Sequence, residues 1–167
     1  MLNAADALTV ESLAYSTLLG GDDFRHWRAA TPSPERIVER GPPVVYARAD
    51  DHVTLTLNRP LGRNATNATM RDALCEALDT VLEDPTRPLL TLRGAGRCFS
   101  TGGDLAEFGR ARNLAEAHAI RQLRSPAALL ARLGTRAEVV VHGATVGAGI
   151  EIAAAAHRRI ARADALF

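Results

Sequence analysis

Residues 139–156, VVVHGATVGAGIEIAAAA, are the stretch from which the fold of this chain can be predicted. The β-branched start predicts a strand, the glycines at 143, 147 and 149 predict a tight turn, and the alanine-rich end predicts a helix that carries Glu151. The first N–H groups of a helix lack intrahelical partners. The stretch therefore predicts backbone donors at the positive end of a helix dipole, close to one carboxylate.

A second stretch of the same kind lies upstream. Residues 93–108, RGAGRCFSTGGDLAEF, follow the apolar run 89–92, which we expect to be a strand buried on both faces. They contain Gly102 and Gly103 and end in a segment, 104–108, that we expect to be helical. Two glycine turns of this kind can direct two backbone N–H groups at one oxygen atom, which is how an oxyanion is stabilised.

The two stretches resemble the signature segments of the enoyl-CoA hydratase/isomerase (crotonase) family. Residues 97–105, RCFSTGGDL, match the first segment and residues 142–153, HGATVGAGIEIA, match the second. The turn at 58–60 resembles the family's first loop, and order and spacing agree over residues 44–167. The resemblance implies an α/β fold, a crotonase-like spiral of ββα units, whereas periodicity alone also allows an ordinary open α/β sheet.

The resemblance also implies an activity. It predicts an enzyme of the hydratase or isomerase type that stabilises the enolate of an acyl-CoA thioester between the N–H groups of Gly103 and Ala148, the oxyanion-hole positions. Glu151 matches a catalytic glutamate of the family, a general acid or base. The helix dipole lowers the pKa of this carboxyl and apolar neighbours raise it, and sequence does not decide between them. Asp104 is expected to be a turn or capping residue.

Coenzyme A is expected only as part of the substrate, with no permanently bound cofactor. Asn64 and Ala65 resemble the family's loop that lines the coenzyme tunnel. Arg59, Arg63 and Arg97 are candidates for binding its phosphates, because arginine pairs well with phosphate oxygens.

The chain departs from the family at its C-terminal end. Family members continue beyond the position of Phe167 with a segment that carries a second carboxylate and much of the subunit interface. The family forms trimers or hexamers, so a homo-oligomer is expected, although much of that interface is missing. Three interpretations stay open: a fragment of a hydratase or isomerase, a short enzyme that uses one carboxylate for hydrolysis or isomerisation, and a non-catalytic module that binds coenzyme A or a partner.

Composition excludes several other classes of protein. The 20 basic residues, all arginine, nearly balance 19 acidic residues, so neither a nucleic-acid surface nor lysine chemistry is expected. The two cysteines, Cys75 and Cys98, form no metal spacing, and we expect them to be reduced. The chain shows neither a secretion signal nor a run of apolar residues that could span a bilayer, so the expectation is a soluble cytoplasmic protein with no metal.

The rest of the chain divides at residue 43. Residues 1–43 are expected to be an appendage of unknown role with one short helix around 23–28, and residues 44–167 an incomplete crotonase-like core. Within the core the patterns predict a hairpin over 44–57 that turns at 50–51, followed by a helix capped by Thr66 or Asn67. They also predict two helices over 114–133, the second of which starts at Pro126, and a strand at 159–161.

Overall fold

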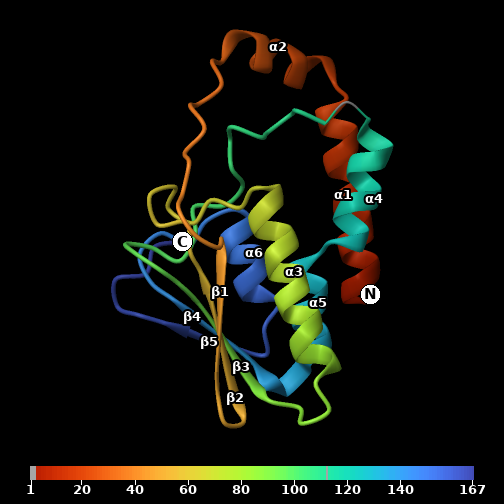
Figure 1. Ribbon diagram of the computed structural model, residues 1–167. Coiled ribbons are helices and arrows are strands. Elements are labelled where there is room, and N and C mark those ends of the chain that lie inside the picture. The colour runs from red at the N-terminus through yellow and green to blue at the C-terminus, as the bar shows by residue number, and fades with distance from the viewer. Residues whose placement is uncertain (1–2, 112) are drawn as a thin grey trace.

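The computed structural model describes residues 3–111 and 113–167, with helices packed on one side of a single sheet (Figure 1). The described helices and strands are, in chain order, α1 (Ala4–Leu19), α2 (Asp22–Ala30), β1 (Val44–Ala49), β2 (His52–Leu57), α3 (Ala68–Glu83), β3 (Leu89–Gly94), α4 (Leu114–Leu123), α5 (Pro126–Leu133), the 3-10 helix η1 (Gly134–Arg136), β4 (Ala137–Val141), α6 (Ala148–Ala154) and β5 (Arg158–Ala161).

The five strands lie in the sheet in the order in which they occur in the chain. The pair β1–β2 is antiparallel and forms the predicted hairpin, with Asp50 in the left-handed conformation at its turn. The pairs β2–β3, β3–β4 and β4–β5 are parallel. Parallel strands end at the same edge of the sheet, so the loops that follow β2, β3 and β4 gather there.

A second set of parallel contacts connects the loops that leave these strands. Isolated bridges join Thr66 to Gly103, Ser100 to Thr145, and Ala144 to Leu166. Each successive strand is therefore followed by a short extended segment that pairs with the equivalent segment of the next unit. This repeat confirms the predicted spiral and excludes the ordinary open sheet.

The hydrophobic core lies between the sheet and helices α3, α5 and α6. The helix starts agree with the sequence: the Asn67 side chain accepts the N–H of Met70 at the start of α3, and Ser125 accepts the N–H of Ala128 at the start of α5. The large side chains with almost no exposed surface come from β2, α3, β3, α5, β4 and the loop after β3: Val53, Leu55, Leu57, Met70, Leu74, Leu78, Val81, Leu90, Leu92, Phe99, Leu130 and Val139.

Two local expectations are wrong. Strand β3 is not buried on both faces: Leu90 and Leu92 face the core, but Leu89 is 49% exposed, because the described helices cover only one face of the sheet. Residues 104–108 form consecutive turns instead of a helix. The N–H groups of Glu107 and Phe108 bond three residues back, and Gly109 follows with a φ of 73°.

Residues 1–43 contain two described helices, one predicted and one missed. Helix α2 confirms the short helix expected around 23–28. Helix α1 was not predicted, although Asn3 caps it by accepting the N–H of Asp6. Figure 1 shows α1 and α4 side by side at the edge of the molecule, beyond α3 and α5. No helix in the described part of the chain is both long enough and apolar enough to cross a membrane.

Candidate active site

The two glycine turns predicted from the sequence pack against each other. The N–H of Val146 donates to the carbonyl of Ser100 over 3.1 Å. Gly102 has a φ of 87°, and a Cβ atom at this position would lie 2.9 Å from the carbonyl oxygen of Val146 and 3.4 Å from the amide nitrogen of Ala148. Glycine is therefore required at 102 by both its conformation and the closeness of the second turn.

The amides of Gly103 and Ala148 are available to a ligand. Within the described residues, neither N–H donates a hydrogen bond to the protein. Gly103 is exposed and Ala148 is half-buried. Ala148 is not among the residues with positive φ, so an alanine occupies this position without backbone strain. Two unused donors thus lie on adjoining turns.

Glu151 follows Ala148 by one helical turn on α6 and is exposed at the surface. The surrounding protein still raises the pKa of its carboxyl, first through desolvation and second through the negative charge of Glu11. Desolvation also raises the pKa of Tyr15; the charge of Arg121 lowers that pKa and the charge of Glu151 raises it. Glu11 and Tyr15 are one turn apart on α1, so this helix brings two titratable groups toward Glu151. Neither Glu11 nor Tyr15 could be predicted from the sequence, because no motif indicates where α1 docks.

Arg59 has a structural role and does not offer its guanidinium to a coenzyme. Its side chain is almost completely buried, lies 3.1 Å from a carboxylate oxygen of Asp104 and donates to the carbonyl of Ala65. The other carboxylate oxygen of Asp104 accepts the N–H of Ala106. The prediction of Asp104 as a turn residue is confirmed, and the suggestion that Arg59 contacts phosphate is wrong.

Asn64 also faces the interior. Its side-chain oxygen accepts the N–H of Arg59 over 2.8 Å, and its amide nitrogen donates to the carbonyls of Ala95 and Cys98 at 2.8 and 3.0 Å. These bonds satisfy a fully buried side chain and hold Asn64 in a left-handed conformation. The Asn64 side chain shapes the loop after β2, while the half-buried Ala65 lies next to it in the same loop.

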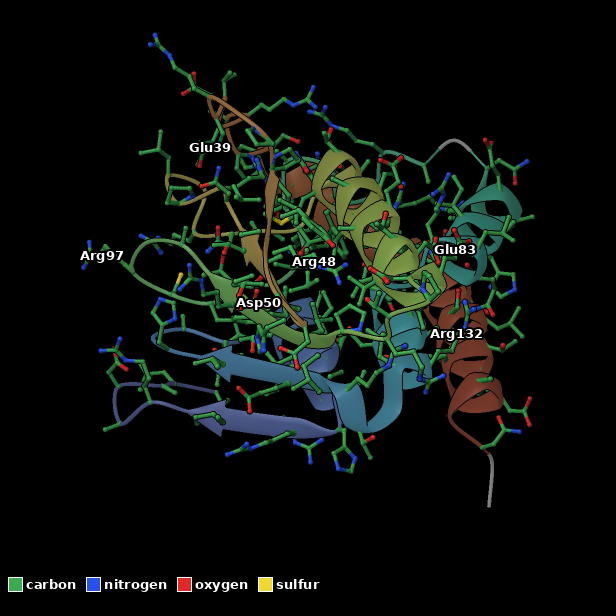
Figure 2. All side chains as sticks on the ribbon, turned by 60° about the horizontal axis from the view of Figure 1, so that its bottom comes forward. Glu39, Arg48, Asp50, Glu83, Arg97 and Arg132 are labelled. Atoms are coloured by element: carbon green, nitrogen blue, oxygen red, sulfur yellow. The ribbon has the colours of Figure 1, made fainter. Side chains whose placement is uncertain are left out.

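Arg63 and Arg97 are exposed on neighbouring loops. The charges of both lower the pKa of the Cys98 thiol, although desolvation has the larger effect and raises it overall. Figure 2 shows Arg97 at the tip of the loop after β3, with its side chain extending away from the molecule. Among the described residues, no carboxylate forms an ion pair with either guanidinium.

The two cysteines and His142 are also residue types that can take part in catalysis, but the structure gives no sign of such a role. Both cysteines are free and buried, and desolvation raises the pKa of Cys75 to about 11, which keeps the thiol protonated and unreactive at neutral pH. The Nε2 atom of His142 lies 3.0 Å from the carbonyl oxygen of Gly96. Residues 3–111 and 113–167 contain no group of three or more ligands suited to a metal ion.

Comparison with known proteins agrees with this geometry. The family model described as "Enoyl-CoA hydratase/isomerase" matches residues 52–167, which include both glycine turns and Glu151. This chain belongs to the enoyl-CoA hydratase/isomerase family. The N-terminal helices α1 and α2 lie outside the match.

Some relatives of this chain are named as hydratases and others as isomerases. This chain is 35% identical over 126 residues to the probable enoyl-CoA hydratase EchA14 of Mycobacterium tuberculosis, and the match covers 74% of this chain and 48% of that protein. It is 33% identical over 120 residues to the trans-2-decenoyl-[acyl-carrier-protein] isomerase of Streptococcus mutans, covering 68% of this chain and 44% of that protein. The chain thus spans about half the length of these relatives.

Solved structures show the same fold. The enoyl-CoA hydratase/carnithine racemase of Magnetospirillum magneticum superimposes with a TM-score of 0.66 at 29% identity, over 74% of this chain and 47% of that one. The family therefore supplies the architecture that brings the two turns together.

Proposed function

We propose that this protein binds an acyl-CoA thioester and catalyses a hydratase- or isomerase-type reaction through an enolate. The observation that carries the proposal is that the unused amides of Gly103 and Ala148 lie on two turns in direct contact. A thioester carbonyl oxygen placed between them would accept two hydrogen bonds. These bonds would strengthen as negative charge develops on the oxygen, so they would stabilise the transition state more than the bound substrate. One donor of this kind contributes about 3 kcal/mol in other enzymes.

Glu151 is the proposed general acid or base. It lies on the helix that begins with Ala148, so the same element positions the carboxylate and one oxyanion donor. A carboxyl with a raised pKa is a stronger base when ionised and retains its proton closer to neutral pH. In hydration, Glu151 would take a proton from the water that adds at the β-carbon; in isomerisation, it would move a proton between carbons.

The coenzyme is proposed to lie along the loops that follow β2 and β3. Arg63 and Arg97 are exposed there without carboxylate partners in the described structure, so they can meet phosphate oxygens. The Asn64 side chain is occupied within the protein, and its proposed part is to hold the loop in which Ala65 and the backbone could contact the coenzyme.

The test is the variant Glu151→Gln assayed with a short trans-2-enoyl-CoA. Loss of the enoyl absorbance measures turnover, and calorimetry measures binding. We expect turnover to fall by at least about a hundredfold, the usual contribution of a general acid or base, while binding changes less than about threefold. Glu116→Gln, the same change at an exposed residue of α4, is the matched control and should retain turnover.

Two results would contradict the proposal. Unchanged turnover in Glu151→Gln would reject this residue as the acid or base. Tight binding without turnover by the unsubstituted protein, on enoyl-CoA and 3-hydroxyacyl-CoA alike, would instead identify a non-catalytic module that binds coenzyme A.

A further inference from the structure

A cavity of about 380 Å³ lies beside the proposed active site and has no part in the proposed chemistry. It is open to solvent and is lined by the start of α3, by the turns that follow Gly103, and by α4. Among the residues that the structure describes, its lining includes three arginines, Arg71, Arg110 and Arg121, but only one carboxylate, that of Glu107. The arginines come from three separate segments, so the tertiary structure alone brings them together.

The single carboxylate of the cavity is already engaged. One oxygen of Glu107 accepts the N–H of Ala68 at the start of α3 over 2.8 Å. The other lies 3.5 Å from the guanidinium of Arg36 in the segment before β1. Glu107 is thus bonded to groups other than the three arginines, and three arginines against one carboxylate give the described lining an excess of positive charge.

Arg121 carries a charge without a counterion. Its Nε atom donates to the hydroxyl of Ser12 over 2.9 Å, and its Nη2 atom donates to the carbonyl of the same residue over 3.1 Å and to the hydroxyl of Ser16. Its guanidinium also stacks 5.0 Å above the ring of Tyr15. All of these partners are neutral. No carboxylate in the described part of the chain lies within ion-pair distance of Arg121 or Arg110.

Burial makes the missing counterion costly. Desolvation lowers the pKa of Arg121 from its ordinary value, which means that the protein around it disfavours the charged form. The Nε and Nη2 groups of Arg121 are bonded to Ser12 and Ser16, so in the described structure its Nη1 group is the one left for an anion, to which it would donate a charge-assisted hydrogen bond. Arg71 adds a further cation, although it also contacts Asp72 at 2.9 Å.

We propose that the cavity lined by Arg71, Arg110 and Arg121 binds the anionic group, phosphate or carboxylate, of a small-molecule ligand. The planar fork of arginine fits either anion. Two sources would supply this chemistry: a phosphate of the coenzyme, or a carboxylate at the far end of the acyl group. The site goes beyond the proposed reaction, since none of its arginines takes part in proton transfer or oxyanion binding.

The experiment titrates inorganic phosphate by calorimetry at constant ionic strength. The unsubstituted protein should bind it saturably, and Arg121→Gln and Arg110→Gln should each weaken binding by about tenfold, the effect of losing one charge-assisted hydrogen bond. Arg132→Gln on α5 is the matched control, because this exposed arginine does not line the cavity and its loss should change nothing.

Arg110→Gln keeps the test decisive even if Arg121→Gln folds poorly. The Arg110 side chain forms no hydrogen bond or ion pair among the described residues, so its loss should leave stability unchanged. No saturable binding by the unsubstituted protein would overturn the proposal. Equal affinity in the unsubstituted protein, Arg110→Gln and Arg132→Gln would overturn it as well.

A second series identifies the source of the anion. If Arg110→Gln weakens binding of coenzyme A but not of dephospho-coenzyme A, the cavity takes the 3′-phosphate. If it weakens binding of glutarate and leaves coenzyme A unaffected, the cavity takes an acyl carboxylate. If Arg110→Gln weakens the binding of neither coenzyme A nor glutarate, the proposal is contradicted. Glu151→Gln should leave phosphate binding unchanged, so failure of the proposed reaction can be told apart from failure of this site.

Discussion

The guanidinium of Arg59 and the carboxylate of Asp104 form a buried ion pair at 3.1 Å, with the two side chains only 4% and 14% exposed. The pair joins the loop after β2 to the turn that contains Gly103. It therefore fixes the backbone on which the first proposed oxyanion donor lies. Removing one partner of a buried pair leaves an uncompensated charge, which costs more than the pair itself contributes.

We expect Asp104→Asn to lower the free energy of unfolding by about 3 kcal/mol, because Arg59 would keep a buried charge without a counterion. Urea denaturation measures the loss. Asp72→Asn is the control: its partner Arg71 lies at 2.9 Å, but Asp72 is 41% exposed, and we expect a loss of at most about 1 kcal/mol. Equal losses in the two variants would contradict the importance of the Arg59–Asp104 pair.

Gly102 and Gly103 should respond in opposite ways to alanine. A Cβ at 102 would lie 2.9 Å from the carbonyl oxygen of Val146 in a backbone of positive φ, whereas a Cβ at 103 would meet nothing within 4 Å. We expect Gly102→Ala to cost about 1–3 kcal/mol and to separate the two turns, which lowers turnover.

Gly103→Ala keeps the backbone N–H and should change stability by less than about 0.5 kcal/mol. Denaturant curves and enoyl-CoA turnover, measured on both variants, test the pair. A Gly102→Ala variant with full activity would show that contact between the turns is not required.

Stability should depend on pH through Glu151. Because its folded-state pKa is raised above 4.5, the folded protein holds more protons than the unfolded chain between these two pKa values. The free energy of unfolding therefore falls as pH rises through this window. Glu151→Gln removes the effect, so its melting temperature relative to the unsubstituted protein should be higher at pH 7 than at pH 4. A difference that does not vary with pH would show that the pKa is not raised.

Glu11 should influence Glu151 across the interface between α1 and the core. Its negative charge is the second cause of the raised pKa, after desolvation. Glu11→Gln should therefore lower the pKa of the Glu151 carboxyl, and desolvation by the surrounding protein should keep that pKa above the ordinary value. A carbon-13 NMR titration of the labelled carboxyl measures the shift. Glu116→Gln removes a charge from α4 instead and should leave this pKa unchanged; an equal response would show that the effect is not specific to Glu11.

Features that depend on neighbouring residues could be predicted from the amino-acid pattern. Alternation over 44–57 indicated the hairpin, Asn67 and Ser125 marked the starts of α3 and α5, and the glycines of residues 139–156 marked the second turn. These signals are local, because a cap or a left-handed turn residue acts within a few positions of the chain. The resemblance to the family supplied the spiral, which the local patterns left undecided.

Contacts between groups far apart in the chain could not be predicted from local patterns, because they depend on how the elements pack. Arg59 and Asp104 are 45 residues apart, and their pairing helps hold 104–108 in turns where a local pattern predicts a helix. The docking of α1 beside α4 brings Glu11 and Tyr15 toward Glu151 and leaves Arg121 without a counterion. Packing and charge act through space, so the environments of Glu151 and Arg121 depend on a docking position that no neighbouring residue specifies.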